Sequence, residues 1–415
     1  MTSTSTTFDY LASLFRPLGE GHVVRVVRLG DDWSIPRSGD LSGDVVIVGR
    51  MPVRGRPAPS TVVNGVRREV ALVRLRLRPP AGLRVASVER LAPVHRPGRL
   101  RRLIRAATMG GLLIELAERP VRPRVIDAIS AAAGGRVTAR LRPSGDGSAV
   151  SILELADGDR AVLRVVPDGH PDDVRHSRAA LLALEAADVP AVPRPLAEGA
   201  IAGATWTTET FIKGGHIPRL TRGVLDDVVD VVARYPPGSA EDDALAAHFA
   251  TVQRMRPGDA PILERIHDAA RRWAGPARVL QHGDLWLHNV LVADGRLAGI
   301  IDWEVWHPNG LPGLDLLSLL AAEERSVNGR DTGDLLVDGY WHGDAVRAAL
   351  ERYFASRGEP PPDADRLAGI AIGWWASRIA FADGRIDQPA RDPVWARRNI
   401  EAPIASIVRR LDEPA

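Results

Sequence analysis

Apolar positions in the first part of the chain form short runs that are rich in β-branched residues and separated by Pro- and Gly-rich segments. Runs of this kind, bounded by turn residues, are typical of β-strands. They predict strands at residues 23–29, 44–48 and 69–77. Between residues 99 and 118 the apolar positions follow a helical spacing, which predicts a helix. Residues 1–130 carry no motif with evident chemistry, and we interpret them as an N-terminal extension of unknown role.

From Arg136 onwards the pattern indicates a small α+β unit, to which we assign residues 131–214. Three apolar runs predict successive strands, and the amphipathic stretch after them predicts a helix. A proline-rich segment ends this helix, and another strand follows before Gly214 and Gly215. The predicted elements are strands at residues 137–141, 149–155 and 160–166, a helix at 171–187 and a strand at 206–212.

Beyond Gly215 the spacing of apolar residues is mainly helical, and we assign residues 215–415 to a helical unit. A short strand and a hairpin interrupt the helices near the middle of this part. The helices are predicted at residues 224–234, 240–255, 262–273, 314–324, 345–354, 367–381 and 394–411, and the strands at 278–281, 290–292 and 297–301.

Three oxygen-bearing side chains stand in this interruption, within the sequence Q-H-G-D-L-W-L-H-N-V-L-V-A-D-G-R-L-A-G-I-I-D-W-E. Asp284 and Asn289 lie on the loop before the predicted hairpin, and Asp302 follows it. The hairpin, turning at A-D-G-R, returns Asp302 to the end where Asn289 leaves the loop. Amide and carboxylate oxygens suit Mg²⁺, which takes few protein ligands together with substrate phosphates. The pattern therefore predicts a magnesium site.

Asp284 would face the same place as a carboxylate that the metal does not use. A phosphoryl transferase needs this arrangement, because one carboxylate orients the acceptor hydroxyl while metal ligands help to neutralise the phosphates. Each residue taken alone could equally serve as a turn or cap residue. The three at this spacing, inside apolar flanks, favour the chemical interpretation.

The motif H-G-D-L-W-L-H-N, followed by I-I-D-W-E, resembles the catalytic signature of the aminoglycoside phosphotransferase and choline kinase superfamily. The segment G-L-P-G-L-D-L-L at residues 310–317 is similar to the next element of that family, an Asp that opens a helix. The resemblance covers the chain from about residue 135 onwards. It implies a two-lobed, protein-kinase-like α+β fold with a small β-rich N-lobe and a mainly helical C-lobe. A small α/β extension would precede the two lobes.

The resemblance also implies roles for individual residues. Asp284 would be the catalytic base, His282 and Asp315 would brace its loop, and Asn289 and Asp302 would hold Mg²⁺. ATP or GTP would be bound by the N-lobe. The nucleotide phosphates would be covered by a turn that contains Ser144, Gly145 and Gly147, and they would be contacted by Arg164. The backbone near Glu209 and Phe211 would contact the adenine or guanine ring.

The expected acceptor is a hydroxyl group of a small molecule, such as a sugar, a glycan precursor or a hydroxylated natural product. Helices after residue 314 would form its pocket, with Trp374, Trp375 and Arg378 as candidate wall residues. His288 and His307 are interpreted as loop packing or substrate contacts, because they lack the spacing of metal ligands. The tryptophans near the motif are interpreted as core or pocket-wall residues.

Two departures from the family pattern leave alternatives open. Arg164 stands where the family has a lysine, and the following helix has Arg178 or Ala179 where a glutamate would pair with that lysine. One alternative is a pseudokinase-like binding or regulatory module without turnover. Another is nucleotidyl rather than phosphoryl transfer in the same fold.

Composition narrows the setting further. The 415 residues carry a formal net charge of +2, which predicts no general attraction to nucleic acid. Cysteine is absent, which excludes disulfides and thiolate sites. Without an evident membrane-spanning run or signal peptide, we expect a cytoplasmic protein that binds no membrane. Lys213 is the single lysine among many arginines, which is typical of GC-rich actinobacterial genomes. The oligomeric state is left open.

Overall fold

In the computed structural model, residues 25–28, 45–50, 84–90, 111–117, 125–137, 142–143, 149–167, 171–238, 244–383 and 392–412 are described. The chain divides into two compact units. The first contains Met1–Arg175 and Pro195–Phe211, and the second contains His176–Arg194 and Ile212–Ala415. Residues 176–194 thus belong to the helical unit, whereas the sequence-based ranges grouped them with residues 131–214.

The first unit contains a four-stranded sheet with the strand order β1-β2-β4-β3. Its strands are β1 (Arg25–Arg28), β2 (Val45–Arg50), β3 (Arg84–Arg90) and β4 (Gly111–Ala117). β1 and β2 confirm two predicted strands, whereas β3 was not predicted. The predicted strand at residues 69–77 lies outside the described residues.

The helix predicted at residues 99–118 is wrong over its last part, because Gly111–Ala117 is the strand β4. β4 pairs with β2 on one side and with β3 on the other, so it is a central strand. A short apolar run fits a buried strand and a buried helix equally well by its spacing. The rest of that predicted helix lies outside the described residues.

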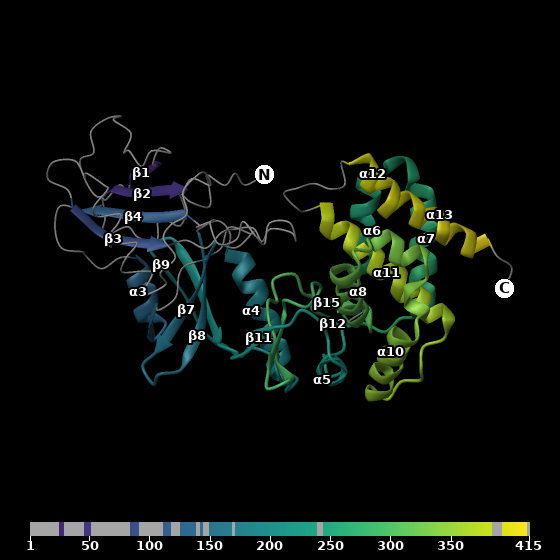
Figure 1. Ribbon diagram of the computed structural model, residues 1–415, viewed down its shortest axis with the longest axis horizontal. Helices are drawn as coiled ribbons and strands as arrows, with labels where there is room; N and C mark the ends of the chain where they lie inside the picture. Colours follow the sequence, from purple (N-terminus) through teal and green to yellow (C-terminus); the bar gives the residue numbers. More distant parts are fainter. Residues whose placement is uncertain are drawn as a thin grey trace. The chain divides into compact units, whose positions relative to one another are not determined.

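A second sheet in the same unit has the order β5-β7-β8-β10-β9, with β6 paired to β7. The helix α3 (Val125–Ala132) packs its apolar side chains against one face of this sheet (Figure 1). The predicted strands at 149–155, 160–166 and 206–212 are confirmed, whereas α3 and β9 were not predicted. The strands are β5 (Gly135–Val137), β6 (Arg142–Pro143), β7 (Ala149–Leu155), β8 (Arg160–Pro167), β9 (Pro195–Ile201) and β10 (Ala204–Thr210).

The second unit is mainly helical, as the sequence predicts. The long helix α11 packs against α6, α7, α8 and α9, and its Trp375 is fully buried (Figure 1). The helices are α4 (Pro171–Ala186), which begins in the first unit, α5 (Arg222–Val232), α6 (Ala244–Met255), α7 (Ala260–Ala274), α8 (Leu314–Asn328), α9 (Thr332–Val337), α10 (Asp344–Ser356), α11 (Ala364–Asp383), α12 (Pro393–Ala396) and α13 (Ala402–Asp412). Short 3₁₀ turns lie at Pro257–Asp259 and Tyr340–His342.

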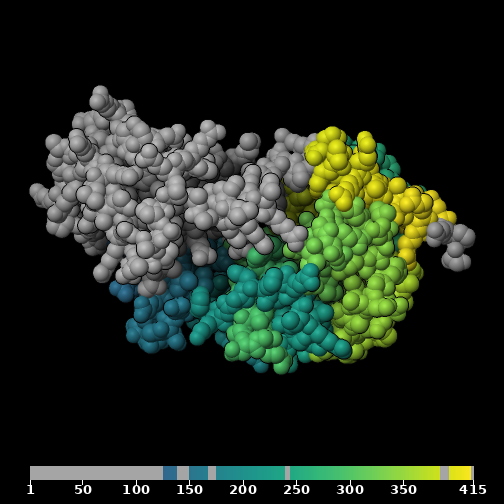
Figure 2. All heavy atoms as spheres, in the orientation of Figure 1, coloured from purple at the N-terminus to yellow at the C-terminus, as the bar shows by residue number. Residues whose placement is uncertain are grey.

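The last predicted helix, residues 394–411, is not a continuous α-helix. A π-helical turn at Arg397–Glu401 separates α12 from α13. The Trp375 indole N–H donates to the Asn399 carbonyl over 2.8 Å, and the Gly333 N–H donates to Asn399 Oδ1 over 2.9 Å. These two bonds hold the turn on the core. The space-filling view shows α12 and α13, in yellow, lying against the green helices of this unit (Figure 2).

Four short strands of the second unit carry the segment with the polar motif. β12 (Val279–Gln281) pairs with β15 (His307–Gly310). The hairpin β13 (Val290–Ala293) and β14 (Arg296–Ile300) extends a sheet with β11 (Gly215–His216). Its register sets Val290 opposite Ile300, so the residues just outside the hairpin, Asn289 and Ile301, are neighbours. The predicted hairpin is thus confirmed, and with it the α+β class with a β-rich first part and a mainly helical second part.

None of the described helices has both the length and the apolar character required to cross a bilayer.

Candidate active site

The loop after β12 is anchored by a buried carboxylate from another element. Asp315, in the first turn of α8, accepts hydrogen bonds from the backbone N–H groups of His282 (2.7 Å) and Gly283 (3.1 Å). Burial raises the pKa of the Asp315 carboxyl, whereas the two N–H donors act to lower it. The buried carboxyl and the loop therefore stabilise each other.

The imidazole of His282 is fully buried and joins two parts of the site. Its Nδ1 accepts from the Asp284 backbone N–H over 3.3 Å, so the neutral tautomer with a proton on Nε2 is assigned from the bonding pattern. Nε2 then donates to the carbonyl of Ile301, the residue before Asp302, over 3.0 Å. His282 thus connects the backbone positions of Asp284 and Asp302, and it acts by positioning rather than by touching a substrate.

Gly283 lies at the tightest point of this loop. Its φ is +79°, and a Cβ added there would meet the Val305 carbonyl oxygen at 2.1 Å. A side chain at this position would face both an unfavourable backbone conformation and a backbone clash. The glycine is therefore required for the loop to pass the segment after Asp302.

We expect Gly283→Ala to destabilise the fold much more than Gly295→Ala. Gly295, in the β13–β14 turn, has a φ of +76° but nothing within 4 Å of an added Cβ. Gly295→Ala should therefore cost only the backbone term of about 1–2 kcal/mol, to which Gly283→Ala adds the clash. Urea unfolding midpoints of the two variants give the comparison. Equal losses of stability in the two variants would show that the segment near Val305 moves aside without a cost in free energy.

Asn289 and Asp302 meet at the open end of the hairpin. The Asn289 side-chain N–H donates to the Asp284 carbonyl over 2.9 Å, and the Ile301 N–H donates to the Asn289 carbonyl over 2.9 Å. Asp302 has a φ of +74°, a backbone conformation uncommon for residues other than glycine. Such conformations persist where the surroundings hold them and are frequent at functional sites. The structure therefore joins Asp284 to Asn289 by a hydrogen bond, and it bonds Ile301, the residue before Asp302, to both Asn289 and His282.

The donor set at this end of the hairpin suits a metal that takes few protein ligands. Because Asn289 is buried and donates through its amide nitrogen, its Oδ1 is the atom that a cation would use. The Asp302 carboxylate would add a charged oxygen. Among the described residues, no three His, Cys, Asp or Glu side chains cluster as metal ligands. A small oxygen set of this kind fits Mg²⁺ with phosphate oxygens better than a cation held by protein alone.

Asp284 has a cationic neighbour that the sequence did not reveal. Both terminal nitrogens of Arg378, on α11, lie near Asp284 Oδ1, at 3.2 and 3.3 Å. The side chains of Arg378 and Asp284 are only 14% and 20% exposed. The Arg378 guanidinium also stacks over the Phe381 ring at 4.5 Å. The candidate wall residue Arg378 therefore pairs directly with the candidate base.

The candidate nucleotide residue Arg164 lies in the first unit. Leu163 and Val165 face the core that α3 covers, so Arg164, between them on β8, faces the opposite side of the sheet. Its Nε lies 3.9 Å from Glu209 Oε1, and the two side chains are 10% and 11% exposed. The counter-charge that the sequence did not supply on the following helix comes from the neighbouring strand β10.

Other predicted nucleotide contacts are only partly placed by the structure. Ser144, Gly145 and Gly147 lie outside the described residues. The Phe211 backbone N–H donates to the Arg160 carbonyl over 3.2 Å, so this N–H already has a partner in the sheet. The role of Glu209 and Phe211 beside the purine ring of the nucleotide stays a prediction.

Trp374 and Trp375 were predicted as candidate wall residues of an acceptor pocket, but both are core residues. They are 2% and 0% exposed, because α11 is buried between its neighbouring helices. His288 packs edge-on against Trp286, with ring centroids 4.5 Å apart, and His307 against His248 at 5.3 Å. Burial, followed by the nearby His176, lowers the pKa of His307. These contacts agree with packing roles for both histidines.

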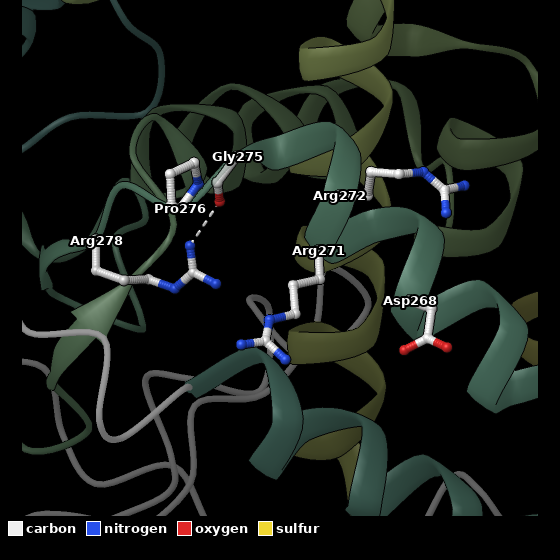
Figure 3. A pocket seen from close by; sticks show the side chains of 6 residues that line it. All are labelled: Asp268, Arg271, Arg272, Gly275, Pro276 and Arg278. Carbon is white, nitrogen blue, oxygen red and sulfur yellow. Dashed lines mark hydrogen bonds between the residues drawn. The ribbon is translucent and has the colours of Figure 1, made fainter.

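A surface pocket of about 370 Å³ lies elsewhere in the second unit, at the C-terminal end of α7 (Figure 3). Arg278 donates to the carbonyls of Gly275 and Ala277, both over 2.9 Å. Arginines beside the last carbonyls of a helix complement its dipole, which accounts for this cluster without a ligand. None of the candidate site residues lines this pocket. Its lining residues are Asp268, Arg271, Arg272, Gly275, Pro276 and Arg278.

Comparison with solved structures finds several phosphotransferases. Aminoglycoside phosphotransferase APH(3'')-Id from Streptomyces rimosus is 21% identical, with 60% of this chain and 94% of that chain covered and a TM-score of 0.41. Macrolide 2'-phosphotransferase MphH from Brachybacterium faecium is 17% identical, with 69% and 98% covered and a TM-score of 0.40. A putative fructosamine-3-kinase from Haemophilus somnus is 10% identical, with 63% and 88% covered and a TM-score of 0.43.

No curated protein sequence is significantly similar to this chain. The family model described as "Phosphotransferase enzyme family" matches residues 138–354, which is more than half of the chain. The matched range includes the strands after residue 149 and the motif that contains Asp284. The predicted protein-kinase-like fold and superfamily are thereby confirmed. The chain belongs to the phosphotransferase enzyme family.

Proposed function

We propose that this phosphotransferase moves the γ-phosphoryl group of ATP, or GTP, onto a hydroxyl group of a small molecule. The observation that carries the proposal is the set of hydrogen bonds that joins Asp284 to Asn289 and holds Ile301, the residue before Asp302, on Asn289 and His282. It combines a carboxylate that can orient a hydroxyl with two oxygen ligands for a cation. Phosphoryl transfer relies on positioning and charge neutralisation, and these residue types supply both.

Asp284 is the proposed base. Its backbone is held on both sides, by the His282 ring through its N–H and by the Asn289 side chain through its carbonyl. Both terminal nitrogens of Arg378 bond to Oδ1, so Oδ2 is the oxygen proposed to accept the proton of the acceptor hydroxyl. A base fixed in this way needs little rearrangement when the hydroxyl arrives.

Asn289 and Asp302 are the proposed holders of Mg²⁺, through Oδ1 and the carboxylate respectively. When bound, Mg²⁺ would help to neutralise the nucleotide phosphates. The protein supplies one formal charge here, and the left-handed backbone at Asp302 sets the direction in which that charge is presented. The buried amide of Asn289 supplies the second oxygen without adding charge.

Mass spectrometry of candidate acceptors incubated with ATP and Mg²⁺ tests the proposal. Sugars, glycan precursors and hydroxylated natural products are the acceptors to screen. An added phosphate supports phosphoryl transfer, whereas an added AMP would show nucleotidyl transfer instead. An unchanged panel, together with measurable nucleotide binding, would favour a pseudokinase-like binding module.

We expect Arg164→Ala to weaken nucleotide affinity by about 1.5–3 kcal/mol, the range for hydrogen bonds that involve a charged group. The expectation rests on the position of Arg164, on the sheet face that does not pack on α3. A guanidinium is always charged and can fork onto phosphate oxygens. Calorimetric titration with Mg-ATP gives the affinity, and Arg164→Lys should not restore wild-type binding, because an ammonium cannot fork onto two phosphate oxygens as a guanidinium can.

The design must separate nucleotide contact from folding, because Arg164→Ala leaves Glu209 buried without its counter-charge. The double variant Arg164→Gln with Glu209→Gln removes both charges. It should therefore be more stable to unfolding than Arg164→Ala, yet bind nucleotide as weakly as Arg164→Ala does. Arg136→Ala is the matched control, since Arg136 is an 82% exposed arginine of the same sheet, paired with Glu154. Wild-type affinity in the double variant would assign Arg164 a purely structural role.

A further inference from the structure

The charge beside the candidate base bears on which acceptors the enzyme can use. Asp284 would offer an acceptor hydroxyl a negative charge, but Arg378 places a positive charge on the same carboxylate. The two nitrogen–oxygen distances of 3.2 and 3.3 Å are within hydrogen-bond range. The pair carries no net formal charge, so Arg378 offsets much of the attraction that Asp284 would exert on a cationic ligand.

Arg378 is held in this place by its surroundings. α11 is anchored in the core by Trp375 and Ile379, on either side of Arg378 in the sequence, and both are fully buried. The guanidinium stacks over Phe381, one turn further along the same helix, at 4.5 Å. Because its side chain is only 14% exposed, it cannot swing freely into solvent when a ligand enters. The positive charge is therefore a permanent part of the site.

We propose that Arg378 is a specificity-determining residue, which selects acceptors that carry no ammonium group next to the accepting hydroxyl. The substrate class is then an uncharged polyol or sugar hydroxyl rather than an aminated one. The inference rests on the proposed function, since it assumes that Asp284 orients the acceptor.

The physical argument concerns the distance between charges. A hydroxyl bonded to Asp284 Oδ2 places its neighbouring substituents within roughly 6 Å of the guanidinium, because both groups contact one carboxylate. At this distance, in the effective dielectric of a protein surface, repulsion by Arg378 offsets more than half of the attraction that the nearer Asp284 exerts on an ammonium group. An aminated acceptor thus gains only a small electrostatic advantage from the carboxylate and still has to be desolvated. An uncharged acceptor meets no such penalty.

The test compares acceptors that differ only in charge. The probes are glucosamine and N-acetylglucosamine as one pair, and 3-amino-1,2-propanediol and glycerol as another, at a pH where the amines are protonated. Phosphate transfer from ATP is followed by ³¹P NMR, and kcat/KM is compared within each pair. Arg378→Met removes the charge at similar length, Arg378→Lys keeps it, and Arg347→Met, at a 53% exposed arginine of α10, is the control.

We expect wild type, Arg378→Lys and Arg347→Met to prefer the uncharged member of each pair. Arg378→Met should shift the ratio of kcat/KM toward the aminated member by about tenfold or more, since Asp284 then attracts the ammonium unopposed. A merely structural role of Arg378 would lower both rates together and leave the ratio unchanged.

Each remaining outcome decides the inference. Preferential transfer to the aminated members by wild type would overturn it while the proposed function stands. An unchanged ratio in a folded Arg378→Met variant, checked by circular dichroism, would also overturn it. If neither uncharged probe is phosphorylated, the inference is overturned as well. If no probe at all is phosphorylated and ATP is not turned over, the proposed function fails together with the inference.

Discussion

Asp284→Asn is expected to lower turnover by roughly 10² or more, the usual contribution of a positioned general base, while nucleotide affinity changes little. The substitution keeps the shape of the side chain and removes the group that accepts a proton. The hydrogen bonds from the backbone of residue 284 to the side chains of His282 and Asn289 do not depend on the carboxylate, so the loop should keep its conformation. A loss in kcat without a loss in nucleotide binding is the signature of an interaction made in the transition state.

Single-turnover rates and calorimetric nucleotide affinities measure the two quantities separately. Asp294→Asn is the matched control, because Asp294 is an exposed aspartate at the turn of the adjacent hairpin. This control should retain wild-type turnover. If purified Asp284→Asn does so as well, Asp284 is not the base and the network around it serves the loop alone.

The local elements of the site could be predicted from the sequence because their signals are local. The hairpin of β13 and β14 needs only two apolar runs and the A-D-G-R turn, and the structure contains both strands at the predicted place. The turn sets Ala293 opposite Arg296, but a β-bulge between Leu291 and Val292 shifts the register by one residue. This shift makes Asn289 and Ile301 neighbours, so the strands could be predicted locally but their final register could not.

The charge partners could not be predicted, because each is set by the packing of distant segments. Arg378 is 94 residues from Asp284 in the chain, and their contact depends on how α11 packs in the helical core. Glu209 meets Arg164 because β10 pairs with β8 in one register, which no local pattern specifies. The strand β4 was read as a helix for a related reason, since its two flanking strands, and not its own spacing, decide its conformation.

Replacement of Asp302 is expected to remove the Mg²⁺-dependent part of nucleotide binding. Asp302→Ala deletes the only charged oxygen of the proposed donor pair, and it also places alanine at a φ of +74°, where a side chain is strained. Asp302→Asn avoids that second effect, because asparagine tolerates the left-handed region far better than most residues. The comparison of the two variants therefore separates lost charge from lost backbone geometry.

If the carboxylate binds the cation, both variants should lose at least about 1.5–3 kcal/mol of Mg-ATP affinity, the range for an interaction with a charged group. In the presence of a chelator, the variants should bind ATP no more weakly than wild type, because the carboxylate of the wild type then has no cation to attract and only repels the phosphates. Calorimetry with and without Mg²⁺ makes this comparison directly. Unchanged Mg-ATP affinity in Asp302→Asn would mean that Asp302 serves the turn after β14 and that the cation is held elsewhere. A loss confined to Asp302→Ala would instead show that the left-handed backbone, and not the charge, is what nucleotide binding requires.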